Sequence, residues 1–195
     1  MSQSLHIPMF PLTLLPLPGE LVPLHIFEPR YKQLLQDAEQ DDISFGIYFN
    51  HEINTEKLGS LMKLESVIKR YPGGELDIIV KCTALFTLEK LSRTFNTKMY
   101  PGGEVLMQEQ ESLLIPGPAL YHLFAEYMTH RNITNHFTAF DLFQIANELT
   151  LDTHERYKFL ISSPDKKEKF LTTQIKFQLH VLKQEAKSKD VFHLN

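Results

Sequence analysis

Cys82, the one cysteine of the chain, is the residue whose type could supply a covalent nucleophile. A reactive cysteine needs a neighbouring base or positive charge that stabilises its thiolate. Cys82 lies instead inside the apolar segment LDIIVKCTALFTL, residues 76–88, which is typical of a buried strand. We therefore expect a small core residue at this position, and a single cysteine forms no internal disulfide.

A repeated Tyr-Pro-Gly-Gly sequence, at residues 71–74 and 100–103, could in principle cradle a phosphate group. Phosphate-binding loops are followed by a helix start or a lysine, and neither copy is. Proline presets φ at the second residue of a turn, and glycine accepts the positive φ that a type II turn needs next. Both copies, and the shortened Pro18-Gly19, therefore predict turns that connect strands.

The histidines and carboxylates show no pattern that selects a metal site or an acid–base pair. His122 and His130 are two turns apart on a predicted helix, His136 follows it, and we recognise no ligand spacing around them. The phosphate-loop, nucleophile-elbow and His-Glu-x-x-His sequences are missing. We expect no catalytic residue, no cofactor and no metal, hence no enzyme. An unrecognised hydrolase stays open as a third possibility.

The composition is that of a globular protein, with 195 residues, 43% hydrophobic and 23% charged, and a formal net charge of −4. A mildly acidic chain is a poor candidate for following phosphates, so nucleic acid is not expected as a partner. Prolines interrupt the first apolar stretch, no positive residue precedes it, and no run approaches the roughly 20 residues of a membrane span. We expect a cytoplasmic location and no membrane partner.

Strands are predicted in the first part of the chain, up to about residue 111, where short apolar runs are rich in Ile, Val, Phe and Tyr. The candidates are ELVPLHIF (20–27), SFGIYF (44–49), SLMKLESVIKRY (60–71), LDIIVKCTALFTLEKL (76–91) and EVLMQEQE (104–111). The fourth is too long for an average strand, so we expect it to bend or bulge. Pro23 places the first at a sheet edge or a bulge.

Helices are predicted once near the start and then from about residue 117 onward, after the pattern changes at Pro116. The candidates are residues 29–40, 118–130, 138–149 with Thr138 as N-cap, 152–162 with a capping box of Asp152 and Glu155, and 162–187. The segment IPGP, residues 115–118, interrupts both periodicities and predicts the junction. The sequence therefore favours an α+β protein with a β-rich part, residues 1-111, and a helical bundle, residues 117-190.

The N-terminal sequence IPMFPL…LPLPGELVPLHIFEPRYKQLLQDAEQDDISFGI closely resembles the start of the Lon protease N-terminal domain family. The shared positions are Pro8, Phe10, Pro11, Leu12, Pro18, Gly19, Pro23, Leu24, Ile26, Phe27, Glu28, Arg30, Tyr31, Asp42, Phe45, Gly46 and Ile47. GSLMKLESV, GGELDIIVKCTALFTL and the helical tail are similar as well, although Thr83 and Leu85 replace the family's Gly and Arg.

This resemblance implies a β-rich, PUA-like sheet that is twisted and partly closed, followed by a C-terminal helical bundle. It implies a substrate-binding domain that recognises polypeptide substrates or a protein partner through exposed apolar surface. It does not extend to the ATPase and protease domains of Lon, so we expect a stand-alone member that lacks both.

Phe27, Glu28, Arg30 and Tyr31 form the centre of the family motif and are the candidate site residues. A structural interpretation makes them the lock between a strand and a helix, with the rings of Phe27 and Tyr31 on one face. It predicts that Arg30→Ala costs about 1–3 kcal/mol, as for a buried polar group that loses its partner. A functional interpretation makes Glu28 and Arg30 a binding pair at the surface.

Two functions from different classes follow. The first is a non-catalytic module that binds polypeptide segments or a protein partner, for instance by adding an extended peptide to an exposed sheet edge. The alternative is a PUA-like RNA-binding protein, suggested by fold analogy and opposed by the acidic charge. The ligand, the binding surface and the oligomeric state stay open.

Overall fold

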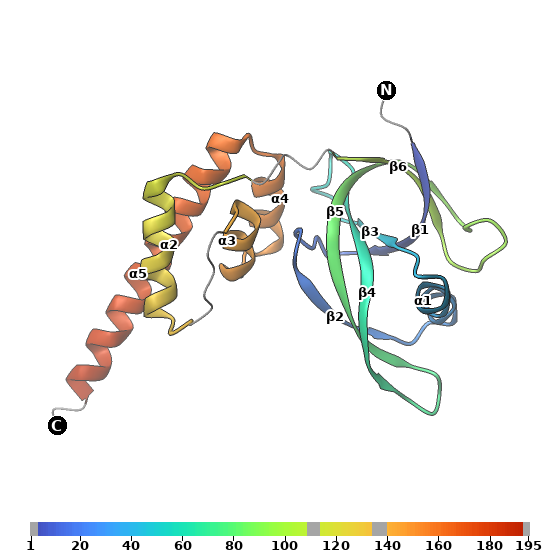
Figure 1. Cartoon of the computed structure of the whole chain (residues 1–195), viewed down its shortest axis with the longest axis horizontal. Helices are drawn as coiled ribbons and strands as arrows, with labels where there is room; N and C mark the ends of the chain where they lie inside the picture. Colours follow the sequence, from blue (N-terminus) through green and yellow to red (C-terminus); the bar gives the residue numbers. More distant parts are fainter. Residues whose placement is uncertain (1–3, 109–113, 134–139, 193–195) are drawn as a thin grey trace. The chain divides into compact units, whose positions relative to one another are not determined.

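The computed structural model describes residues 4–108, 114–133 and 140–192, with side chains as far as Glu185 (Figure 1). The chain divides into two compact units. The first unit comprises Met1–Glu111 and Asp152–Tyr157, and the second comprises Ser112–Leu151 and Lys158–Asn195. Six strands and five helices in the described residues confirm the α+β prediction.

The first unit is a six-stranded sheet with one helix. Its elements are β1 (Leu5–Leu12), β2 (Leu21–Ile26), α1 (Pro29–Asp41), β3 (Phe45–Phe49), β4 (Leu58–Arg70), β5 (Leu76–Ser92) and β6 (Gly102–Met107). The strand order is β2-β5-β4-β3-β1-β6, and β5 also pairs with β6. Five strands therefore close on themselves, and β2 lies outside the ring on the edge of β5. The predicted twisted, partly closed sheet is confirmed; its PUA-like classification stays a prediction.

Strand β5 joins the whole sheet because it is long enough to pair with three strands. Residues 76–81 pair with β2, residues 76–87 with β4 and residues 86–92 with β6, as the long β4–β5 hairpin of Figure 1 shows in part. The register shifts against β6 between Leu88 and Lys90, and against β4 at three places. These irregularities confirm the predicted bend or bulge, which lets one strand follow a curved sheet.

Strand β1, which contains Pro8 and Pro11, was not among the predicted strands. It nevertheless pairs in parallel with β3 over Met9–Leu12 and antiparallel with β6 over Leu5–Pro8. The amide of Met9 finds its acceptor at the carbonyl of Pro101, at 2.8 Å. Proline lowers the expectation of a strand locally, but the pairing of the neighbouring residues decides here.

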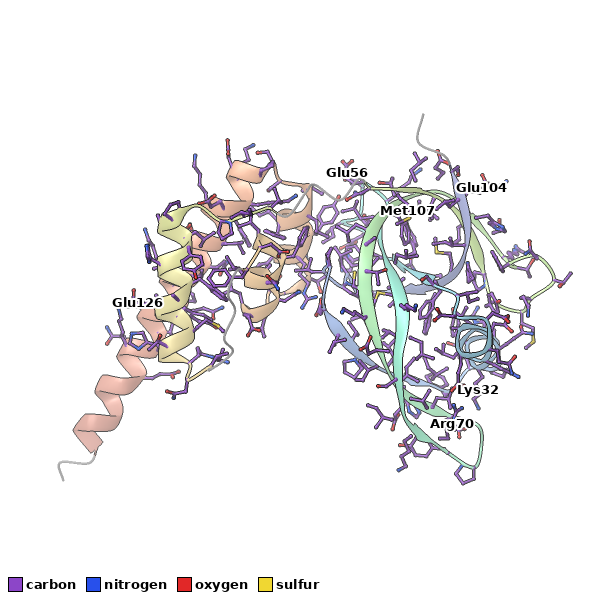
Figure 2. All side chains as sticks on the ribbon, in the orientation of Figure 1. Lys32, Glu56, Arg70, Glu104, Met107 and Glu126 are labelled. Carbon is purple, nitrogen blue, oxygen red and sulfur yellow. The ribbon has the colours of Figure 1, made fainter. Side chains whose placement is uncertain are left out.

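Two apolar clusters stabilise this unit. Met9, Phe86, Leu88 and Val105 form one inside the closed ring. The other lies between the sheet and α1, whose buried residues are Tyr31, Leu34, Leu35 and Ala38. Ion pairs join α1 to the sheet, and Figure 2 labels a cation from each side, Lys32 on α1 and Arg70 at the end of β4.

The first Tyr-Pro-Gly-Gly copy is the hairpin turn between β4 and β5. The amide of Gly74 donates to the carbonyl of Tyr71 at 2.9 Å. The positive φ, 83°, belongs to Gly74 and not to Gly73. A left-handed fourth residue indicates a type I turn followed by that residue, so the predicted turn is present but its type II assignment is wrong. At Pro18-Gly19 the positive φ of Gly19, also 83°, does follow the proline.

The second copy is not a turn, and this prediction is wrong. Gly102 and Gly103 are the first residues of β6 and pair with both β1 and β5. A Cβ atom on Gly103 would lie 2.9 Å from Cδ1 of Leu88, and one on Gly102 would lie 2.8 Å from Nε2 of His6. The same four residues thus serve different ends, since here glycine allows close packing inside a strand.

The second unit contains α2 (Pro118–His130), α3 (Leu142–Glu148) and α5 (Pro164–Phe192), while α4 (Thr153–Ile161) is divided between the two units. The predicted capping box is confirmed by hydrogen bonds of 3.0 and 2.9 Å between Asp152 and Glu155. Thr138 lies outside the described residues; α3 begins after Asp141, which forms its own capping box with Gln144.

Strands end at Met107 and the second helix begins at Pro118, so the described elements change type around the predicted IPGP junction. The division into domains at 1-111 and 117-190 stays a prediction. Residues Asp152–Tyr157 group with the sheet, although they continue into a helix. Two contacts explain this grouping: Arg156 donates to Glu20 at 2.6 Å, and the hydroxyl of Tyr157 lies 3.0 Å from Oγ1 of Thr55.

Candidate functional site

The four motif residues lie where β2 passes into α1. Pro29 is the first residue of α1, and Glu28 precedes it in an extended conformation without a side-chain cap bond. The Glu28 carboxylate accepts from Nε of Arg30 at 2.9 Å and lies 2.8 Å from Nη2 of Arg30. The side chains of Arg30 and Glu28 are 47% and 39% exposed. The pair is therefore local and solvated.

The two aromatic residues of the motif have different surroundings. Tyr31 is 4% exposed and stacks on Phe10 with ring centroids 3.9 Å apart, and this burial raises the pKa of its hydroxyl. Phe27 is 62% exposed, and its ring lies 6.1 Å from that of His25. We expected the rings of Phe27 and Tyr31 to lie on one face, but Tyr31 stacks on Phe10 instead. Tyr31 belongs to the core, and Phe27 is available at the surface.

Arg30→Ala is expected to lower the free energy of unfolding by less than about 1 kcal/mol, because solvent screens an exposed ion pair. The estimate of 1–3 kcal/mol made for a buried group is too large for this position. Thermal unfolding beside Arg30→Lys, which keeps the charge, measures the effect. If Arg30→Ala melts far below Arg30→Lys, the structural interpretation of Arg30 as a link between strand and helix would be supported after all.

A second polar group joins β2 to the β4–β5 hairpin. Nδ1 of His25 lies 2.6 Å from Asp77, and the hydroxyl of Tyr71 donates to the other oxygen of Asp77 at 2.6 Å. The hydrogen bond from Tyr71, and then that from His25, lowers the pKa of the Asp77 carboxyl. The ammonium of Lys69 lies over the ring of Tyr71, 4.3 Å from its centroid. No local sequence pattern indicates this cluster, since 52 positions separate His25 from Asp77.

Alternate residues of β2 point to opposite faces of the sheet. Val22, Leu24 and Ile26 pack against the core between the sheet and α1. Leu21, Pro23, His25 and, just past the strand, Phe27 are exposed. We call these four residues the β2 surface. Leu21 is 55% exposed, so two large apolar side chains frame the proline and the histidine.

Cys82 carries no nucleophilic chemistry in this fold. It is buried in β5, 1% exposed, and its thiol lies 3.6 Å from the carbonyl of Pro16. Burial raises the pKa of the Cys82 thiol to about 12. The thiolate is therefore scarce at neutral pH, and the prediction of a core cysteine is confirmed.

Consequently, a thiol reagent such as dithionitrobenzoate should not label the folded protein at about pH 8, near the pKa of a free thiol. Denaturant should expose one thiol per chain. The measurement is the absorbance of the released thiolate before and after unfolding. Rapid stoichiometric labelling of folded protein would contradict the burial of Cys82.

Among the described residues, no three His, Cys, Asp or Glu side chains come together as metal ligands would. Glu126 lies one helical turn from both His122 and His130, a carboxylate spacing that was not recognised in the sequence. In the structure its carboxylate accepts from Lys183 at 2.8 Å and lies 3.8 Å from His130. His136 lies outside the described residues. Among the residues that the structure describes, no helix is long and apolar enough to cross a membrane.

The geometry of the first unit is suited to binding by apolar contact, and comparison with known proteins gives the class. The chain matches a substrate-binding domain model over residues 6–190. It belongs to the ATP-dependent protease La (LON) substrate-binding domain family. A search of curated proteins gave no match.

Two solved structures show the same fold. A Lon N-terminal domain protein from Xanthomonas campestris is 22% identical with a TM-score of 0.67; the alignment covers 87% of this chain and 98% of that one. The N-terminal domain of the Mycobacterium avium complex Lon protease is 15% identical with a TM-score of 0.63, and the coverage is 88% and 98%.

Proposed function

We propose that this chain is a non-catalytic module that binds unfolded or extended polypeptide segments at the β2 surface. The observation that carries the proposal is the exposure of Leu21 and Phe27 on a strand at the edge of the sheet. Leu21 and Phe27 lie at the two ends of β2, with the exposed Pro23 and His25 between them, so apolar contacts are offered along the length of an edge strand. Family membership supports the same role, since the matching model is that of a substrate-binding domain.

Binding at this surface needs no reactive or unpaired polar group of the protein. His25 is held by Asp77, and Asp77 is shared with Tyr71, so these polar groups satisfy one another. These hydrogen bonds hold the side chain of His25 in place between Leu21 and Phe27. The affinity should come from apolar area, which gives weak binding of many sequences and little dependence on salt. The cytoplasmic location stays part of this proposal and rests on the single cysteine.

RNA binding is the alternative, and the charges of the first unit oppose it. Lys63 pairs with Asp42 at 2.9 Å, Arg70 with Glu39 at 2.5 Å and Lys98 with Asp37 at 2.8 Å. These cations are already partnered by carboxylates. A protein that follows a phosphate chain needs a row of cations without such partners.

The test is fluorescence anisotropy with two probes, labelled reduced and carboxymethylated α-lactalbumin and labelled poly(U) RNA. We expect micromolar-range or weaker binding of the polypeptide that changes little between about 0.05 and 0.2 M salt, and no RNA binding at the higher salt. Tight RNA binding that falls steeply with salt would favour the alternative. No binding of the polypeptide would refute the proposal.

A further inference from the structure

The outer edge of β2 is a row of backbone groups without a strand beside it. Every other described strand of the sheet has at least two strand neighbours, whereas β2 pairs with β5 alone. Its register with β5 runs through six consecutive pairs, from Leu21–Lys81 to Ile26–Leu76, without a shift. A regular, exposed edge is a template for another strand.

The hydrogen bonds at the start of β2 show which groups face outward. The amide of Cys82 donates to the carbonyl of Glu20 at 2.9 Å, on the flank of the pair Leu21–Lys81. That bond marks Leu21–Lys81 as a pair that exchanges no hydrogen bonds of its own, and such pairs alternate with bonded ones. The N–H and C=O groups of Leu21 and His25 therefore point away from β5.

Pro23 fits this alternation independently. It has no N–H, and it occupies an outward-facing position, where a missing donor leaves the pairing with β5 intact. The outer edge thus offers two donors and three acceptors over five residues. Pro23 also weakens the edge as a template, which is how natural sheets limit uncontrolled pairing.

The other open stretch in this part of the sheet is differently built. Residues 63–70 of β4 have no strand on the side opposite β5, because β3 pairs only with residues 59–62. This stretch contains two register shifts, and α1 borders it through Lys63–Asp42 and Arg70–Glu39. Bulges and ion-paired side chains protect such an edge, whereas the pairing of β2 with β5 contains no register shift.

The side chains around β2 indicate what kind of segment would fit. Leu21 and Phe27 supply apolar contact on the exposed face, and the partly buried Val22 and Leu24 supply it on the other. Lys81, the cross-strand neighbour of Leu21, is exposed, and in the part of the chain described here it makes no ion pair. A strand added at the outer edge of β2 would lie two strand spacings, about 10 Å, from β5, so an acidic side chain of the bound segment would reach across Leu21 toward this cation.

We propose that the β2 edge binds an extended polypeptide segment as an additional strand, with apolar residues in alternation and an acidic residue near Lys81. This inference rests on the proposed function and specifies how the same surface works. Backbone hydrogen bonds would provide sequence-tolerant affinity, and the side chains would provide the preference.

The experiment changes the outward backbone donors and measures the affinity for reduced, carboxymethylated α-lactalbumin. Leu21→Pro removes one outward N–H at the first residue of the strand, and Leu21→Ala is the matched control that loses only the side chain. We expect the proline variant to bind at least fivefold more weakly than the alanine variant. Circular dichroism and thermal unfolding of both variants check that the sheet is intact.

Pro23→Val and Pro23→Ala add a donor at the same edge and provide the second arm. Both should tighten binding about threefold to tenfold, in line with about 1 kcal/mol for a hydrogen bond. If the wild type binds but the variants of Pro23 bind no more tightly, strand addition is overturned while the proposed function stands. If the wild type binds no polypeptide, the proposed function is refuted, and strand addition with it. Sedimentation without probe tests whether a second copy of the chain pairs with the β2 edge instead. A stable dimer that β2 variants abolish would also overturn this proposal.

Discussion

Gly59→Ala is expected to destabilise the first unit by about 3 kcal/mol, at the upper end of overpacking effects. Gly59 pairs with Phe86 across β4 and β5. A Cβ atom at this position would overlap the Phe86 ring and lie 2.8 Å from the carbonyl oxygen of Ile47. Phe86 is fully buried inside the ring of strands, and the Ile47 oxygen is backbone, so neither group can move aside easily.

Gly74→Ala is the control, because it tests conformation without crowding. A Cβ atom on Gly74 would meet nothing nearer than Nζ of Lys32 at 3.6 Å, but φ is 83°. The expected cost is about 1–2 kcal/mol, that of a left-handed residue with a side chain. Thermal unfolding should place the melting temperature of Gly59→Ala well below that of Gly74→Ala. The reverse order would mean that the interior of the closed ring of strands is looser than the structure shows.

The double variant Leu21→Asp, Phe27→Asp should bind unfolded polypeptide at least tenfold more weakly than the wild type. It removes the two large apolar side chains of the β2 surface, which are 55% and 62% exposed, and replaces them by carboxylates. A tenfold loss corresponds to about 1.4 kcal/mol, well within what two apolar side chains can contribute when a ligand covers them. Stability should change little, since neither side chain is buried.

Leu91→Asp, Met99→Asp is the matched control. These residues are 47% and 56% exposed and belong to the same unit, but Leu91 lies ten positions beyond Lys81 along β5. The control introduces the same charge at similar exposure, away from β2. Equal losses in both double variants would show that binding follows net charge and not the β2 surface.

Local patterns in the sequence predicted the elements whose signals are contained in a few neighbouring residues. Pro23 indicated an edge strand, and Asp152 with Glu155 indicated a helix start; the structure contains both. The long apolar run indicated a bulged strand, because no straight strand of that length fits a curved sheet. Strand β1 was missed because prolines lower strand propensity locally, whereas its pairing with β3 and β6 is set by residues far along the chain.

At the candidate site, too, local sequence patterns did not predict which residues are buried. The motif residues Phe27, Glu28, Arg30 and Tyr31 stand together in the sequence, yet the fold divides them. Tyr31 enters the core, Glu28 and Arg30 form a solvated pair, and Phe27 is exposed. No local signal distinguishes two aromatic residues four positions apart; the strand-to-helix junction assigns their faces. The two Tyr-Pro-Gly-Gly copies likewise differ because only the second is paired on both sides.

Amide hydrogen exchange resolved by residue shows whether β2 is where polypeptide binds. It is measured with and without saturating reduced, carboxymethylated α-lactalbumin. The amides of Val22 and Leu24, which alternate with the outward ones and face β5, should be slow in both states and serve as internal controls. We expect the amides of Leu21 and His25 to exchange fast in the free protein and to become protected when the probe binds. Protection confined to other elements, with Leu21 and His25 unchanged at saturation, would contradict binding at β2.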